Sequence, residues 1–388
     1  MQPAARDRPS TKALTFLYVA LFLLGIFWFN EFLVGVSIRS MKSVYALSLS
    51  LFLMAFTSCG GTHRHFVYTV GQAAEGIFGF EEATSGALTS IAGSPFSTGG
   101  RPTAIAVTPS RTFAYVLSAG GNAIASYNFD KSKGGLTAAN PAVATGVNPV
   151  AIAIDPSSQH LYALNQGSSS ISAYAIDGTS GVLTPLSGSP FATVTNPVSF
   201  ALTAKGDIFY VVSPTQGLEI LTVHSDGTLA VAQGAVAAGV SPAFVTVDPA
   251  DHFVYVADSG GNSVVGFTVS GSNVTPISAS VSTGTTPSAV AVDPQSKFLF
   301  VANQGSNNVS VFSIGSSGAL AQVQGSPFTA GTGPIFVTVD QAGGHLFVAD
   351  QGSSDIAEFS IAGNGSLSPV SGSPISVQTT PTWIAATN

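Results

Sequence analysis

Hydrophobic and polar residues alternate in a pattern that recurs along most of the chain. The clearest copy, PSAVAVDPQSKFLFVAN, begins at Pro287 and has two alternating apolar runs on either side of an Asp-Pro turn. Alternation with period two around a turn predicts a β-hairpin, here with both faces buried. Further copies begin at Pro102, Pro149, Pro197, Pro242 and Pro334, and a shortened copy, PTWIAATN, begins at Pro381.

The copies are 45 to 48 residues apart, a period typical of arrays, solenoids and propellers. Each copy, with the residues up to the next copy, makes one unit, and the pattern within a full unit predicts four strands. In the second unit these are residues 103–107, 113–117, 124–129 and a short outer strand that starts at Leu136. Four-stranded units of about 45 residues in radial array form a β-propeller.

Two series of large apolar side chains support this interpretation, because each recurs once in every unit. We expect them to pack between adjacent sheets, one series on the second strand and one on the third. The second-strand series is Tyr68, Tyr115, Tyr162, Tyr210, Tyr255, Phe300 and Phe347. The third-strand series is Phe80, Tyr127, Tyr174, Leu221, Phe267, Phe312 and Phe359.

The first unit lacks its opening strand, and the missing strand stands at the other end of the chain. Residues 66–70, 77–81 and 87–91 read as strands, while Pro381 to Thr387 matches the absent one. Six complete units and one divided unit make seven blades. The predicted fold is therefore all-β: a seven-bladed β-propeller of four-stranded blades over residues 66–388, whose first blade is closed by the C-terminal strand.

Two apolar runs precede the propeller. Residues 1–40 predict an apolar extension or membrane segment, which stays untranslated if translation starts at Met41 rather than Met1. Residues 41–59 have the basic start, apolar core and small-residue end of an export signal, and residues 60–65 form a linker. The end of the signal resembles that of a bacterial lipoprotein, which implies lipidation of Cys59, the only cysteine. We thus expect export and membrane anchoring in the periplasm or at the cell surface.

The charge of the chain argues against one class of partner. From Gly60 onward it has seven Lys or Arg and seventeen Asp or Glu, an excess of ten negative charges. Such a surface repels nucleic acid and lacks the clustered cations that bind phosphates. Nucleic acid is not an expected partner, and we expect a monomer.

The repeat resembles that of the lactonase family of seven-bladed propellers, to which the bacterial 6-phosphogluconolactonases belong. The matching elements, as they stand in the unit from Pro287, are Asp-Pro, Leu-Phe-Val-Ala-Asn, a Gly-Ser turn, Gly-Ala-Leu and Gly-Ser-Pro-Phe. The Val-Ala-Asn run is also similar to YVTN and NHL propeller repeats. The resemblance implies a lactone hydrolase acting on a small lactone. The alternative is a non-catalytic envelope or surface module that binds a carbohydrate or a surface protein.

In a propeller, the turns between second and third strands share one face with the connections between blades. We call this the amide face, and it is the predicted ligand-binding face. Its candidate residues are Gln166, Gln216, Asp258, Asn262, Gln304, Asn307, Gln351 and Asp355.

The opposite face carries the turns between first and second strands, and we call it the aspartate face. Asp155, Asp248, Asp293 and Asp340 occur in these turns, where we expect their carboxylates to accept backbone N–H groups. His160, His252 and His345 follow in what looks like one homologous slot, filled elsewhere by Thr112, Asp207 or Lys297. That variability predicts a solvated position at the start of the second strand.

Catalytic residues have no clear signature in this sequence. His224, Glu219 and Arg101 are weak candidates, the first two because the unit that contains them departs most from the consensus. No nucleophile elbow, HExxH motif or EF-hand loop occurs, so no metal site or cofactor is predicted. A divalent cation on the axis, bound by Asp and Asn oxygens from different blades, stays an open alternative.

Overall fold

A computed structural model describes residues 64–73, 75–277 and 279–387. The chain divides into two compact units, Met1–Thr62 and His63–Asn388, and the second is described below. The predicted N-terminal segments 1–40 and 41–59, Cys59 and most of the 60–65 linker lie outside the described residues. Within the part of the chain that is described, no helix has the length and hydropathy needed to cross a membrane.

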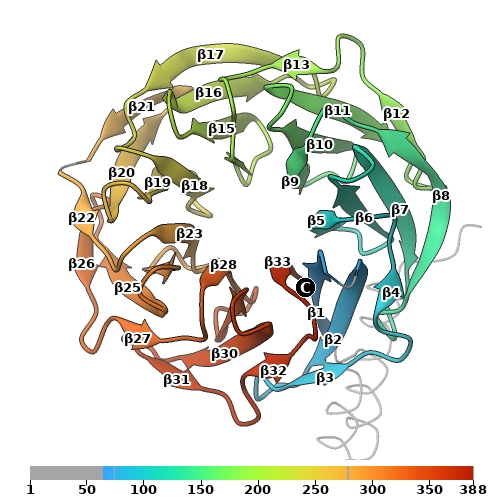
Figure 1. The fold of residues 1–388 in the computed structure, drawn as a ribbon. Coiled ribbons are helices and arrows are strands. Elements are labelled where there is room, and N and C mark those ends of the chain that lie inside the picture. Colours follow the sequence, from blue (N-terminus) through green and yellow to red (C-terminus); the bar gives the residue numbers. More distant parts are fainter. Residues whose placement is uncertain (1–63, 74, 278, 388) are drawn as a thin grey trace, which may run out of the picture. The chain divides into compact units, whose positions relative to one another are not determined.

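The second unit is a ring of seven antiparallel sheets, as predicted (Figure 1). The first strand of each blade lies next to the central axis. In order from blade 1 to blade 7, these first strands are β33 (Pro381–Ala386), β5 (Pro102–Val107), β9 (Pro149–Ile154), β14 (Ser199–Leu202), β18 (Pro242–Val247), β23 (Pro287–Val292) and β28 (Pro334–Val339).

The second and third strands form the middle of each blade. The second strands are β1 (His65–Gly71), β6 (Phe113–Ser118), β10 (His160–Asn165), β15 (Ile208–Ser213), β19 (Phe253–Asp258), β24 (Phe298–Asn303) and β29 (His345–Asp350). The third strands are β2 (Gly76–Glu82), β7 (Ala123–Phe129), β11 (Ser170–Ile176), β16 (Gly217–Val223), β20 (Ser263–Ser270), β25 (Asn308–Ile314) and β30 (Asp355–Ile361).

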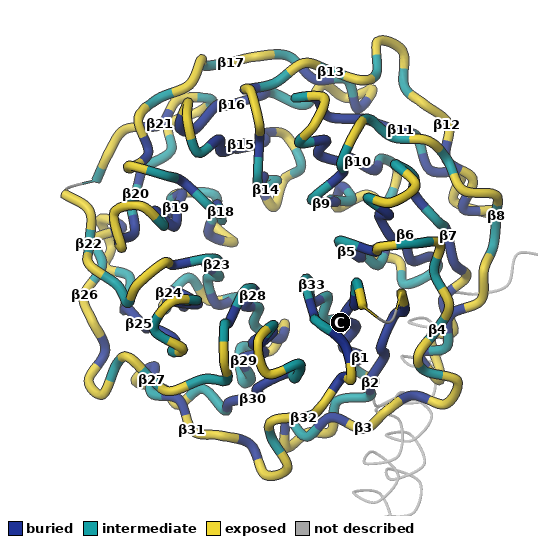
Figure 2. The backbone as a smooth tube through the Cα atoms, in the orientation of Figure 1, coloured by how far each residue is buried: buried dark blue, intermediate teal, exposed yellow. Residues whose placement is uncertain are grey.

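The outer strands lie at the rim of the ring, where most of the exposed backbone is found (Figure 2). They are β3 (Leu88–Ser90), β8 (Leu136–Ala144), β12 (Leu183–Pro185), β17 (Leu229–Val236), β21 (Asn273–Pro276), β26 (Leu320–Gln322) and β31 (Leu367–Pro369). In five blades a second short piece also pairs with the third strand: β4 (Phe96–Ser97), β13 (Phe191–Ala192), β22 (Val281–Ser282), β27 (Phe328–Thr329) and β32 (Ile375–Ser376).

The break in these outer strands explains the recurring Gly-Ser-Pro motif. Where the outer strand bends away, a third-strand N–H loses its carbonyl partner. The serine hydroxyl of the motif accepts that N–H, as Ser189 does from Ala173 and Ser326 does from Val311. Proline suits this rim position because no further strand needs its missing N–H.

Both predicted series of side chains are confirmed as the packing between blades. All seven members of the second-strand series are fully buried, and those of the third-strand series are at most 5% exposed. Four of the tyrosines also donate their hydroxyl to a glycine carbonyl in the next blade: Tyr68 to Gly134, Tyr115 to Gly181, Tyr162 to Gly227 and Tyr255 to Gly318. Each of these contacts therefore joins two sheets by apolar burial and a hydrogen bond.

The closure of blade 1 by the C-terminal strand is also confirmed. β33 lies beside β1 (Figure 1) and pairs with it antiparallel. The register places Val67 opposite Ala386 and Tyr68 opposite Ala385. The Phe66 N–H donates to Thr387 Oγ1 at 3.0 Å, and the Thr387 N–H donates to the Phe66 carbonyl at 2.8 Å. Both ends of the propeller segment thus belong to one sheet.

The tyrosine hydroxyls give a matched pair of stability predictions. The Tyr210 hydroxyl is buried and has no hydrogen-bond partner among the described residues, and the turn between β20 and β21 in the next blade is shorter than its counterparts. Tyr115→Phe should lower the free energy of unfolding by about 1 kcal/mol, since it leaves the Gly181 carbonyl unpaired. Tyr210→Phe should be neutral or stabilising. Urea denaturation followed by fluorescence measures both, and equal losses in the two variants would contradict the proposed difference.

Candidate functional site

Aspartate carboxylates organise the turns of the aspartate face in the predicted way. Asp155 Oδ1 accepts the N–H groups of Gln159 and His160, at 2.7 and 3.0 Å. Asp248, Asp293 and Asp340 accept the two equivalent N–H groups in their own turns. In blades 2 and 4, hydroxyls of Thr108 and Thr203 replace the carboxylate. One carboxylate oxygen of each aspartate is therefore committed to its turn.

The predicted solvated slot for the three histidines is wrong for two of them. The strand register places exposed His252 in the slot of Thr112, Asp207 and Lys297. His160 and His345 lie one residue further on, in a slot that blades 1, 2, 4, 5 and 6 fill with Phe66, Phe113, Ile208, Phe253 and Phe298. These two rings pack against a turn glycine of the next blade, Gly227 and Gly86 respectively. They are therefore largely buried at seams between blades.

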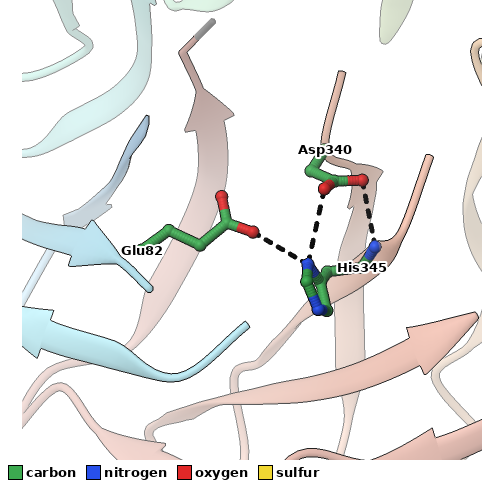
Figure 3. A group of neighbouring side chains, drawn as sticks. All are labelled: Glu82, Asp340 and His345. Atoms are coloured by element: carbon green, nitrogen blue, oxygen red, sulfur yellow. Dashed lines mark hydrogen bonds and ion pairs between the residues drawn. The ribbon is translucent and has the colours of Figure 1, made fainter. Parts of the chain in front are cut away.

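His345 belongs to a cluster at the seam between blade 7 and blade 1, which we call the seam cluster (Figure 3). It consists of Glu82 at the end of β2, Asp340 in the β28–β29 turn, and His345 at the start of β29. His345 Nδ1 lies 3.0 Å from Glu82 Oε1 and 3.4 Å from Asp340 Oδ2. The side chains of Glu82 and Asp340 are each 6% exposed and that of His345 is 15% exposed.

Burial gives the seam cluster unusual electrostatics. The pKa of Glu82 is raised to about 8. Loss of hydration is the main cause, and the nearby carboxylates of Asp340 and Glu358 add to it. Glu358, a buried residue of β30, has its pKa raised to about 7 by burial. Among the described residues, no Lys or Arg forms an ion pair with any of these three carboxylates. The seam thus gathers three acidic side chains without a Lys or Arg to pair with them, and the raised pKa leaves Glu82 mostly protonated at neutral pH.

Glu82 was not among the residues predicted from the sequence, although a signal for it exists. In the other six blades the same register position is apolar: Phe129, Ile176, Val223, Val269, Ile314 and Ile361. A carboxylate in that position breaks the repeat. Aligning the third strands to the end, rather than only at the large apolar residues, would have found it.

Aromatic side chains close the axis of the ring. Phe336 and Trp383 lie 4.5 Å apart between ring centroids, and Phe244 packs edge-on against Phe336 at 5.6 Å. They come from blades 7, 1 and 5, at a position where blades 2, 3 and 6 have alanine. The axis is therefore apolar at this level.

A cavity of about 490 Å³ opens along the axis from this aromatic layer to the aspartate face. Trp383 and Phe336 line its inner end, and Thr108, Arg111 and Gln341 line its mouth. We call it the axial cavity. No carboxylate lines it, so the axial cation left open by the sequence finds no acidic ligands here.

Arg111 is the only cation among the residues that line the axial cavity. Its guanidinium lies over the rings of Phe66 and Phe129, at 5.5 and 5.7 Å, and donates to the Arg64 carbonyl at 2.8 Å. Burial lowers its pKa, but it stays a cation at neutral pH. The cavity thus combines an aromatic inner end with polar groups at its mouth, and Arg111 at the mouth holds its guanidinium at the seam between blades 1 and 2.

The structure does not bring His224, Glu219 and Arg101 together. Glu219 is buried near the start of β16, where its carboxylate accepts the Val194 N–H at 2.9 Å and the Thr193 hydroxyl. His224 is exposed just past the opposite end of β16. Arg101 is exposed in the connection before β5, on the amide face.

The candidate residues of the amide face mostly hold loops in place. Asn262 and Asn307 accept the N–H groups of Thr286 and Gly333 in the connections to the next blade. The side-chain carbonyl of Gln166 accepts from the side-chain amide of Asn148, and that of Gln216 accepts the Thr195 N–H. Asp258 is buried and accepts the Ser241 N–H. Gln304 and Gln351 are half-buried at this face, each with its N–H bonded to a connecting loop.

Asp355 pairs with a buried acid, Asp350, at the hairpin between β29 and β30. In blade 6 the same pair of positions holds Asn303 and Asn308, joined by an amide hydrogen bond of 2.8 Å. Burial first, and then the neighbouring Asp355, raise the pKa of Asp350 from 3.8 to about 8. At neutral pH the two acids therefore share one proton, which replaces the amide hydrogen of the asparagine pair.

Comparison with known proteins agrees with this architecture. The sequence matches the model of a family described as Lactonase, 7-bladed beta-propeller, over residues 64–201 and 270–385. No curated protein matches the sequence.

Solved structures similar to the chain include a protein of Bacteroides fragilis assigned as a 6-phosphogluconolactonase. It has 17% identity and a TM-score of 0.74, covering 85% of this chain and 99% of its own. The periplasmic gluconolactonase of Pseudomonas aeruginosa has 15% identity and a TM-score of 0.69, covering 84% and 99%. At these identities the similarity shows a shared fold.

The shared proton of Asp350 predicts a pH-dependent stability. Because the pKa of Asp350 is raised in the folded state, its stabilising contribution is complete below about pH 4 and is lost as the pH rises toward 8. Asp350→Asn, which restores the asparagine found in blades 3 and 6, should remove this loss. At pH 8.5 the variant should be more stable than the wild type by a few kcal/mol, at about 1.4 kcal/mol per pKa unit.

Thermal unfolding at pH 5 and pH 8.5 measures this difference in stability. Asp355→Asn is the companion variant, because it also leaves one acid and one amide in the pair. A stability difference between Asp350→Asn and the wild type that does not change with pH would contradict the shared proton.

Proposed function

The chain belongs to the lactonase family of seven-bladed β-propellers, and on that basis we propose that it hydrolyses lactones in the axial cavity. The observation that carries this proposal is the combination of Trp383, the polar mouth and Arg111 in one cavity of about 490 Å³. Ligand cavities are typically apolar with a few oriented polar groups, and this cavity has the size for a small cyclic ester.

Each part of the axial cavity has a role in the proposed reaction. The ring of Trp383 packs against the apolar face of the lactone ring, while Thr108 and Gln341 hydrogen-bond its hydroxyls. Water adds to the ester carbonyl, the ring C–O bond breaks, and the released alkoxide takes up a proton to give a hydroxy acid. In the proposed step the guanidinium of Arg111 turns from its place over Phe66 and Phe129 into the cavity, where it stabilises the negative charge that develops on the carbonyl oxygen.

The charges of the cavity also favour a class of substrate. Phosphate groups are usually bound by several cations or by convergent backbone N–H groups. Arg111 alone lines this cavity, so unphosphorylated sugar lactones or aliphatic lactones are the proposed substrates. A phosphorylated lactone should be a poorer substrate than its unphosphorylated counterpart.

The test is hydrolysis of glucono-δ-lactone and an aliphatic δ-lactone by the purified propeller, followed by acid release in a pH-stat. Arg111→Gln should lower kcat/KM by about 100-fold, because one charged donor to the oxyanion is lost. Gln341→Ala should mainly raise KM. Lys205→Gln is the control, since Lys205 is exposed on the aspartate face and outside the cavity. Thermal unfolding verifies that the variants are folded.

Two outcomes would overturn the enzyme proposal. Hydrolysis no faster than in buffer excludes the activity for these substrates, and retention of a carbohydrate without turnover favours a binding module. An active enzyme in which Arg111→Gln leaves kcat/KM unchanged would refute the assignment of the axial cavity.

We also propose that the protein is exported and anchored to a membrane through Cys59. The support is the sequence of residues 41–59, with its basic start, apolar core and Thr-Ser-Cys end, followed by Gly60. Mass spectrometry of the mature N-terminal peptide tests this proposal. We expect a lipidated Cys59 as the first residue, and a Cys59 that is unmodified and still joined to Ser58 would refute it.

A further inference from the structure

The seam cluster brings together three potential ligand atoms from two blades. Glu82 Oε1, Asp340 Oδ2 and His345 Nδ1 all lie within 4.8 Å of one another (Figure 3). We propose that this cluster is a binding site for a divalent metal ion of the Zn²⁺ type, which clamps blade 7 to blade 1. The proposal concerns the stability of the ring and is independent of lactone hydrolysis.

The orientation of the His345 ring favours a metal ligand. A Cβ atom placed on Gly86 would lie 2.7 Å from Nε2, so the Nε2 edge of the ring packs against this glycine. Nδ1 is the nitrogen that faces the two carboxylates. It is fully buried, and it makes no well-aligned hydrogen bond to any described residue. A buried ring nitrogen that faces two carboxylates without a directed hydrogen bond is available to coordinate a cation.

The carboxylates are positioned by the fold as well. Asp340 Oδ1 accepts the N–H groups of Gly344 and His345, at 2.7 and 3.0 Å, which holds Oδ2 toward the cluster. Such outer hydrogen bonds are typical of metal ligands, because they fix the orientation of the coordinating oxygen. Glu82 has His345 as its only ion-pair partner among the described residues. The buried carboxyl group of Glu82 therefore has the imidazole of His345 as its single charge partner in this part of the chain.

A structural carboxylate–histidine pair is the alternative explanation, and the seam between blades 3 and 4 shows what that looks like. There His160 Nδ1 lies 3.1 Å from Asp155 Oδ2, and the position of Glu82 is taken by Val223. In that seam the turn is held by Asp155 alone, and Val223 fills the position of Glu82 by apolar packing. Glu82 is therefore an addition that neither the turn nor the packing requires.

The composition of the cluster indicates the metal. One imidazole and two carboxylates suit Zn²⁺, whereas Ca²⁺ prefers six to eight oxygen ligands. Ligands that bind Zn²⁺ at 2.0–2.2 Å are held roughly 3 to 3.5 Å apart. The two measured separations from Nδ1, 3.0 and 3.4 Å, fall in this range. Three protein ligands leave the fourth position to water.

A metal ion at this seam would join the blade that contains both ends of the propeller segment to its neighbour. Since the ligands converge only in the folded ring, metal binding stabilises the folded state by mass action. At a free metal concentration 100 times the dissociation constant, the stabilisation is about 2.7 kcal/mol. Thermal unfolding can detect an effect of this size.

The test uses the full propeller, stripped of metal with a chelator and then dialysed against Zn²⁺ at pH 7.5. We expect one Zn²⁺ per chain by elemental analysis and a higher unfolding temperature than that of the stripped protein. Glu82→Ile and His345→Phe should each abolish both effects. These substitutions install the residues that blade 6 has in the same positions, Ile314 and Phe298, so the seam keeps an apolar packing already used in this ring.

His160→Phe is the matched control, because it makes the same change in the seam between blades 3 and 4. This variant should still bind one Zn²⁺. The proposal is refuted if the stripped wild type binds no Zn²⁺, or if Glu82→Ile binds it as tightly as the wild type. Binding of Zn²⁺ without a rise in the unfolding temperature would refute the clamp. Metal content and unfolding temperature are both measured without substrate, so they separate this proposal from the enzymatic one.

Discussion

Packing between neighbouring blades is the interaction on which the whole molecule depends. A four-stranded sheet buries neither of its faces by itself, and here each face is covered by the sheet beside it. The aromatic and aliphatic side chains of the second and third strands fill these interfaces, and they are almost completely buried. Stability is therefore distributed around the ring as seven similar contacts, and each contact depends on the presence of both neighbours.

Regular packing also makes departures from the repeat easy to recognise. Glu82 stands where the other six blades have an apolar residue, and His345 where four blades have phenylalanine. The Asp350–Asp355 pair stands where blade 6 has two amides, and Trp383 where three blades have alanine. All four departures lie in blade 1 or blade 7. Only Glu82 differs from all six of its equivalents, which are apolar, so it points most clearly to a role beyond the fold.

Most of the architecture could be predicted from the sequence, because burial at fixed spacing leaves a direct record in the residue pattern. The series from Tyr68 to Phe347 predicted the second strands, and the shortened copy of the repeat at Pro381 predicted the closure of the ring. The site could not be predicted in the same way. His345 and Glu82 lie about 260 residues apart in the chain, and their contact depends on two register positions that no local motif marks. Likewise, nothing in the alternation of the first strands indicates that three aromatic side chains meet on the axis.

The divided first blade has a consequence for the order in which the protein can be completed. Contacts such as that of Tyr68 with Gly134 join residues 66 positions apart, so sheets two to seven can associate in turn as the chain leaves the ribosome. The bond between Phe66 and Thr387 spans 321 positions and has to wait until β33 has been synthesised. Throughout synthesis, β1 therefore presents an unpaired edge that another chain's strand could occupy. Until β33 pairs with it, the edge of β1 is therefore a place where two chains could pair wrongly and aggregate.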